Sequence, residues 1–261
     1  MESCEKCFMG IDLANLRRSF TCAILDAAKH ILFLGAVTPI EWQGLITAGK
    51  NILAAVTSPL TMNEGYMADP EYRRHLNIIP AANRFTELRV CEYELVTRGL
   101  SPTRSPRDVG HFTIGLQKAL KFSSELGMNG FQYWPSPASA RQMFETQADA
   151  CFWSMLGVTP FPSGSLEGRL QRQLALQSKG LPIPDAMEFF EEITRHRLLS
   201  GKLPEEKILS AAELNALVAA YTAWVAGNRP AEHSRVGEPD EGVIILPVPT
   251  LPALNNKLRN K

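Results

Sequence analysis

The chain has 261 residues, of which 45% are hydrophobic and 21% are charged. This length and composition suit one large domain with a full hydrophobic core, and they exclude disordered, collagen-like and disulfide-scaffold proteins. Lys plus Arg and Asp plus Glu each number 27, so the formal net charge is zero. A neutral chain does not coat nucleic acid or a membrane by bulk charge, and contact with a polyanion would require a local basic patch.

The N-terminal residues and the cysteines indicate a cytoplasmic protein. No stretch approaches the ~18 to 20 uninterrupted apolar residues of a membrane span, and no membrane contact is expected. The opening residues, MESCEKCFMGID, lack the apolar core of a signal peptide. Five scattered cysteines argue against a disulfide framework. We interpret residues 1–7 as a flexible tail in which Cys4 and Cys7 are ordinary thiols.

Three short apolar runs open the chain, over residues 8–14, 20–26 and 31–37, and only a few polar residues separate them. This spacing predicts an antiparallel meander of three strands. A helix over 41–50 and a fourth strand over 52–56 follow. Because a helical crossover is too long for a hairpin, we expect the fourth strand to join the sheet in parallel.

The rest of the chain is predicted to be mainly helical. Residues 61–129 are expected to form a helical insertion, with helices over 84–98 and 109–126, before a fifth strand over 130–134. The helix-rich second half contains predicted helices over 138–156, 166–179, 184–199 and 211–226 and a last strand over 242–246. The ordered domain then spans 8–247, and residues 248–261 form a flexible basic tail.

Asp12 lies in the middle of the apolar first strand. A buried carboxylate is costly unless a metal, a cation or several hydrogen-bond donors meet it. The alternative is an acid at a strand end that faces solvent. RNase H-like domains have this layout: three strands, a helix and a fourth strand, with an acid in the first strand. In those domains several acids hold divalent metal for phosphodiester cleavage. Actin-like phosphotransferases share this layout, but the two related halves that they require are not visible here.

Short segments along nearly the whole chain resemble the domain of unknown function 429 family, whose members are regarded as predicted nucleases of RNase H-like fold. The segments occur in the family's order. They are residues 10–12 (GID), 56–61 (VTSPLT), 89–99 (RVCEYELVTRG), 134–136 (WPS), 168–172 (GRLQR), 213–220 (ELNALVAA) and 241–247 (EGVIILP). The resemblance implies an α/β domain with an RNase H-like mixed sheet.

The family pattern implies acids at four positions, and this chain keeps only the first, as Asp12. Thr57, Gln132 and Asn215 stand at the other three. Gln and Asn keep the hydrogen-bonding shape of Glu and Asp but lose the charge. Mg²⁺ and Mn²⁺ prefer anionic oxygens, so one carboxylate would leave a two-metal site under-neutralised. Glu92, in the inserted segment, is the candidate for a recruited second acid.

Two functions are compatible with these residues. In the first, Asp12 and Glu92 hold Mg²⁺ or Mn²⁺ and the protein is a nuclease, with Arg169 and Arg172 binding a substrate phosphate at a loop that enters a basic helix. The alternative to phosphate binding at this loop is a purely structural role, with Ser165 acting as a helix cap. In the second, the fold has lost cleavage and is a non-catalytic module that binds nucleic acid through a local patch, a nucleotide or a protein partner.

Overall fold

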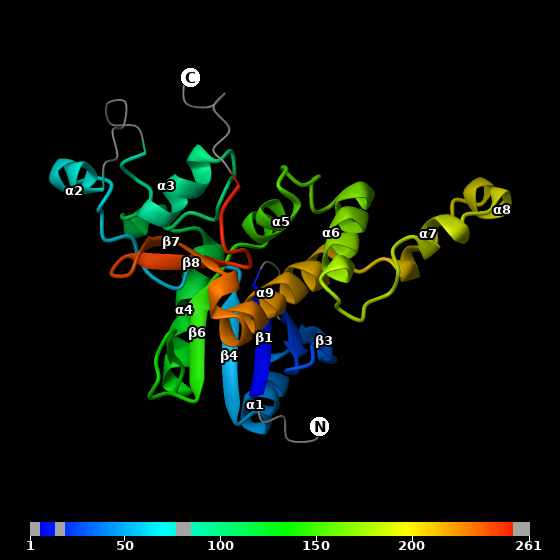
Figure 1. Ribbon diagram of the computed structural model, residues 1–261, viewed down its shortest axis with the longest axis horizontal. Coiled ribbons are helices and arrows are strands. Elements are labelled where there is room, and N and C mark those ends of the chain that lie inside the picture. Colours follow the sequence, from blue (N-terminus) through cyan, green and yellow to red (C-terminus); the bar gives the residue numbers. More distant parts are fainter. Residues whose placement is uncertain (1–5, 14–18, 77–84, 253–261) are drawn as a thin grey trace.

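The computed structural model describes residues 6–13, 19–76 and 85–252, and it has an α/β fold built on one mixed sheet (Figure 1). The strands follow the order β3-β2-β1-β4-β6-β8-β7, and β5 pairs with β6 beside this path. Their bounds are β1 Lys6–Asp12, β2 Phe20–Leu25, β3 Ile31–Val37, β4 Asn51–Val56, β5 Gln132–Tyr133, β6 Arg141–Glu145, β7 Ser234–Glu238 and β8 Gly242–Leu246.

The first half of the sheet forms as predicted. β1, β2 and β3 make an antiparallel meander. Helix α1 (Pro39–Ala48) begins with a capping box between Thr38 and Glu41, and β4 then pairs in parallel with β1, with Ile11 opposite Val56. The carboxyl ends of β1 and β4 therefore meet at one edge of the sheet.

The centre of the sheet differs from the prediction. β6 lies inside the stretch expected to be helical over 138–156, and it pairs in parallel with β4 and β8. Gln, Met and Glu favour helices locally, but pairing between two strands outweighs this weak preference. The strand expected over 130–134 shrinks to the two residues of β5, and β7 was not predicted.

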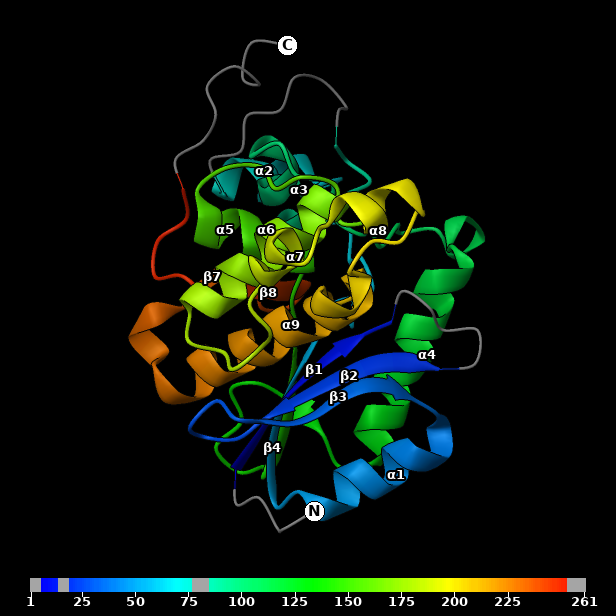
Figure 2. The same ribbon diagram turned by 90° about the vertical axis from the view of Figure 1, so that its right-hand side faces the viewer.

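Helices cover both faces of the sheet (Figure 2). α9 (Ala211–Asn228), α5 (Ala148–Leu156) and α6 (Leu166–Ser178) pack on one face and share a core with Phe8 and Leu53. On the other face, α1 and α4 (Ile114–Met128) contribute Trp42, Phe122 and Leu126 to a core with Met9. Two shorter helices, α2 (Pro70–His75) and α3 (Val90–Thr97), precede α4.

α9 lies directly on β1 because both carry small residues at the contact. A Cβ atom at Gly10 would lie 1.9 Å from the Ala216 carbonyl oxygen and 2.2 Å from the Ala220 nitrogen. Only glycine allows this approach. α9 is buried on nearly every side, as expected for a central core helix.

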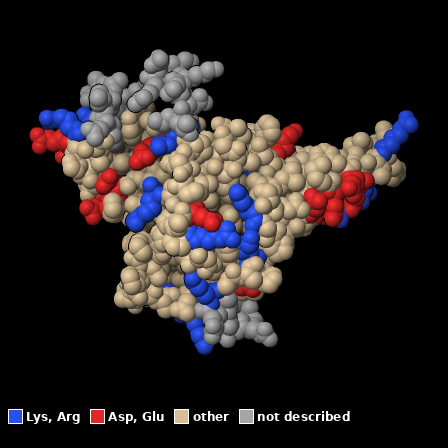
Figure 3. All heavy atoms as spheres, viewed as in Figure 1, with Lys and Arg blue, Asp and Glu red and all other residues tan. Residues whose placement is uncertain are grey.

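Several smaller expectations change. The helix expected over 184–199 is two short helices, α7 (Glu188–Glu191) and α8 (Arg195–Leu199), because Thr194 caps a new helix by accepting from the Arg197 nitrogen. These two helices extend away from the rest of the molecule, with an acidic group followed by a basic tip (Figures 1 and 3).

The ends of the ordered domain also differ. Lys6 and Cys7, expected in the N-terminal tail, belong to β1, and residues 248–252 continue the ordered chain past β8. Cys4, Arg84 and residues 253–261 lie outside the described residues.

One helical stretch among the described residues, Glu205–Asn228, is long and apolar enough to cross a membrane by length and composition. Of the most apolar 18-residue segment of this stretch, 67% is buried inside the fold. That burial is what a core helix requires.

Candidate functional site

A pocket of about 280 Å³ opens at the carboxyl ends of the parallel strands. Asp12 ends β1, Thr57 follows β4, and Gln147 follows β6 by two residues, so the three strands deliver these side chains to one edge. Asn215 adds a wall from the second turn of α9. Ligands of open α/β sheets commonly bind at this edge, which makes the pocket the candidate site.

Asp12 is 4% exposed, and two neutral side chains contact it. Its Oδ1 accepts a hydrogen bond from Thr57 Oγ1 at 2.9 Å, and its Oδ2 accepts one from Asn215 Nδ2 at 3.3 Å. The structure thus brings together three of the residues selected from the sequence. The alternative of an acid facing solvent is wrong.

The contacts of Asp12 are fixed by the fold on both sides. The Thr57 nitrogen donates to the Ile11 carbonyl at 3.0 Å, which holds Thr57 beside the end of β1. A capping box between Ser210 and Glu213 sets the start of α9, and the close approach at Gly10 sets its position over β1. The fold therefore positions the hydroxyl and the amide for direct hydrogen bonds to Asp12.

The residues around Asp12 do not fit a two-metal centre. Within the described part of the chain, no group of three or more His, Cys, Asp and Glu side chains is placed to hold a metal ion. The other carboxylate on the pocket wall, Asp149, accepts a 2.7 Å hydrogen bond from Arg172 Nη2. Two divalent ions carry four positive charges, and hydroxyl and amide groups cannot neutralise them.

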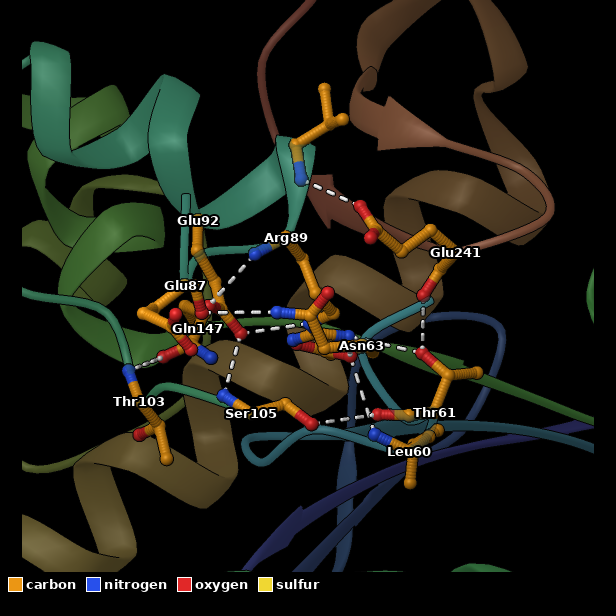
Figure 4. A network of polar contacts seen from close by, with 12 residues as sticks. Leu60, Thr61, Asn63, Glu87, Arg89, Glu92, Thr103, Ser105, Gln147 and Glu241 are labelled. Atoms are coloured by element: carbon orange, nitrogen blue, oxygen red, sulfur yellow. Dashed lines mark hydrogen bonds and ion pairs between the residues drawn. The ribbon is translucent and has the colours of Figure 1, made fainter. Parts of the chain in front are cut away.

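Glu92 does not act as a second acid for Asp12, which corrects the sequence prediction. Its side chain is fully buried and accepts from Arg89 Nε at 2.7 Å and from the Ser105 nitrogen at 2.8 Å (Figure 4). Arg89 also forms two hydrogen bonds to Glu145, at 2.7 and 2.8 Å. Glu92 is part of this buried ion network and does not line the pocket.

Charge pairing keeps Arg89 protonated in spite of its burial. Burial lowers the pKa of Arg89, but Glu145 and Glu92 outweigh it, so the pKa lies well above its ordinary value. Burial raises the pKa of Glu92, and Arg89 and Ser105 partly offset that rise. Because Glu145 ends β6 and Arg89 caps α3, the network joins the inserted segment to the sheet.

Gln132 is also displaced from its predicted role. It is exposed on β5, and its Oε1 accepts from Ser136 Oγ at 2.5 Å. The strand beside β4 is β6, and Glu145, opposite Val56, occupies its carboxyl end. The fifth strand was predicted too early in the chain because the residues of β6 have a pattern typical of a helix.

Arg169 and Arg172 hold the fold together and do not line the pocket. Arg172 is 1% exposed and donates to the carbonyls of Phe161 and Gly168 as well as to Asp149. Arg169 pairs with Glu205 at 3.6 Å. Ser165 caps α6 by accepting a hydrogen bond from the Gly168 nitrogen. The helix-cap interpretation of this loop is therefore correct, and its phosphate-binding role is not supported.

Gln147 is a pocket residue that was not predicted from the sequence. It is 7% exposed, lines the pocket and accepts from the Thr103 nitrogen at 3.3 Å. Its position two residues after a buried strand would have indicated it, had β6 been recognised.

No family model, curated protein or solved structure matches this chain. The family resemblance and the RNase H-like assignment remain predictions from short segments and strand order.

Proposed function

We propose that this protein is a non-catalytic binding module of RNase H-like fold whose pocket holds the nucleoside part of a nucleotide or of a nucleic acid strand. The meander, the parallel β4 and Asp12 at the end of β1 support the fold. The observation that carries the function is that a hydroxyl and an amide contact Asp12 at two of the positions where the family pattern has acids.

The pocket wall favours an uncharged ligand group. The described residues that line it include Asp12 and Asp149 and no Lys, Arg or His, so these residues offer a phosphate no cation. Hydroxyls and amides surround the pocket together with the apolar side chains of Leu13, Leu95 and Leu116. A nucleoside offers hydroxyls to a carboxylate, polar ring edges to amides and flat ring faces to leucines.

The test measures binding and cleavage on the same purified full-length chain. Fluorescein-labelled single-stranded RNA and DNA are followed by anisotropy in EDTA and in Mn²⁺, and the strands are then examined on a denaturing gel. We expect binding in EDTA and intact strands in Mn²⁺. Strand cleavage that Asp12→Asn abolishes would overturn the proposal, and so would binding that EDTA abolishes or failure to bind any strand or nucleoside.

A further inference from the structure

A group of exposed apolar side chains lies on a projecting segment of the fold. This segment, the arm, spans residues 184–207 with α7 and α8 and extends away from the rest of the molecule (Figure 1). Five of the 14 exposed large hydrophobic side chains among the described residues belong to it: Met187, Phe190, Leu198, Leu199 and Leu203. Single exposed leucines are ordinary, but such a group amid charged residues indicates a surface that a partner covers.

The arm is anchored at its root, so its shape is set before any partner binds. The side chain of Gln173, on α6, is fully buried, and its Nε2 donates to the carbonyls of Pro184 at 2.8 Å and of Lys207 at 3.0 Å. Its Oε1 accepts from the Leu209 nitrogen at 2.8 Å. One side chain thus joins both ends of the arm to α6, and Phe189 packs in a small core at the same place. A preformed surface loses little conformational freedom on association.

The two helices of the arm carry opposite charge. The acids in and directly after α7 are Glu188, Glu191 and Glu192, and the cations in and directly after α8 are Arg195, Arg197 and Lys202. Lys207 and Arg197 use part of this charge in ion pairs within the arm. Glu191, Arg195 and Lys202 form no ion pair with any described residue. Figure 3 shows the acidic group nearer the fold and the basic group at the far end of the arm.

We propose that the arm is a self-association surface and that its partner is the arm of a second copy of this chain. A partner of uniform charge, such as a nucleic acid or a basic peptide, would be attracted to one helix and repelled by the other. Two arms that lie side by side in opposite directions about a two-fold axis place the cations of each α8 beside the acids of the other α7. The exposed leucines of both arms then leave water. This inference does not rest on the proposed function.

Sedimentation of the full chain in the analytical ultracentrifuge tests the proposal, at protein concentrations from about 1 to 200 µM. We expect a reversible equilibrium between monomer and dimer. Association should weaken as salt is raised from about 0.05 to 0.5 M, because the charges of the arm are exposed and are screened by salt. A chain that sediments as a monomer over the whole range would overturn the proposal.

An apolar substitution locates the surface. Leu199 is 81% exposed and ends α8, so Leu199→Gln removes apolar surface without opening a core. The dissociation constant should rise by at least about 100-fold, because burying one leucine is worth roughly 10-fold or more and a two-fold interface buries two. Met128→Gln is the matched control, since Met128 is 79% exposed and ends α4, and it should leave the equilibrium unchanged. Thermal melting shows that each variant keeps its fold.

A charge exchange tests the direction in which the arms pair. Arg195→Glu makes the basic end acidic, and Glu191→Lys makes the acidic end more basic, and neither residue has an internal ion pair to lose. Each variant alone should dissociate at least about 10-fold more readily, because like charges then face each other twice. An equimolar mixture of the two variants should recover the dimer, since opposite charges meet again at both ends. Loss of a structural contact would not produce this recovery.

The remaining outcomes contradict the proposal. A dimer that persists unchanged in Leu199→Gln would show that another face associates. An equal loss in Met128→Gln would show that association is a nonspecific contact between apolar side chains. A mixture of the charge variants that stays monomeric would rule out the antiparallel pairing of arms.

Discussion

Asn215→Asp places a second carboxyl group 3.3 Å from the Asp12 carboxylate, where an amide now donates. At an effective dielectric constant of about 20, two unit charges at that distance repel by about 5 kcal/mol. The introduced group avoids this repulsion by taking up a proton, which also restores a hydrogen bond to Asp12.

Protonation limits the loss of stability and makes it dependent on pH. Holding a proton at pH 7 on a group whose ordinary pKa is about 3.9 costs about 4 kcal/mol, and at pH 5 it costs about 1.5 kcal/mol. The pKa of the introduced group is raised in the folded state, so the folded chain binds the extra proton and stability decreases as the pH rises. We therefore expect the free energy of unfolding to fall by up to these amounts relative to the natural chain.

Urea denaturation at pH 5, 7 and 8 measures this difference. Asn228→Asp is the control on the same helix, because Asn228 is exposed and its Oδ1 already accepts from Lys6. The control should change stability by less than about 0.5 kcal/mol at each pH. An equal loss at pH 5 and pH 8 in Asn215→Asp would refute the placement of Asn215 against Asp12.

Three further predictions concern the fold around the site. Arg89→Met leaves Glu92 and Glu145 buried without their cation, and the free energy of unfolding should fall by about 3 to 5 kcal/mol, measured by urea denaturation; a loss below about 1 kcal/mol would contradict the network. Gly10→Ala forces α9 away from β1 and should cost about 3 kcal/mol, read from the same experiment, while a neutral result would contradict the close contact. Burial and Arg235 lower the pKa of His233, so the unfolded chain binds its proton first and stability should fall as the pH drops below about 6.5. Melting temperatures from pH 7.5 to 5 should show a smaller fall in His233→Gln, and parallel curves would count against this explanation.

The sequence predicts the first half of the sheet well because its signals are local. Apolar runs separated by a few polar residues specify the meander, and a helix between two strands requires parallel pairing. Asp12, Thr57 and Asn215 follow from that layout together with the family resemblance. They meet although 203 residues separate Asp12 from Asn215.

The remaining site residues depend on contacts that no local pattern records. β6 is a strand because β4 and β8 pair with it, and this pairing places Glu145 and Gln147 where Gln132 was expected. Glu92 and Arg172 carry charges suited to catalysis or phosphate binding, yet each is neutralised by a partner: Glu92 by Arg89, which also binds the distant Glu145, and Arg172 by Asp149. Sequence position shows a charge, and only the fold shows its partner.

Calorimetric titration of Mn²⁺ into the natural chain and into Asp12→Asn tests the central claim most directly. If the Thr57 hydroxyl and the Asn215 amide bind Asp12 in place of a metal ion, the two titrations will be indistinguishable and neither will show stoichiometric binding. Binding of one or two Mn²⁺ ions per chain that disappears in Asp12→Asn would contradict the account and restore a metal-dependent nuclease.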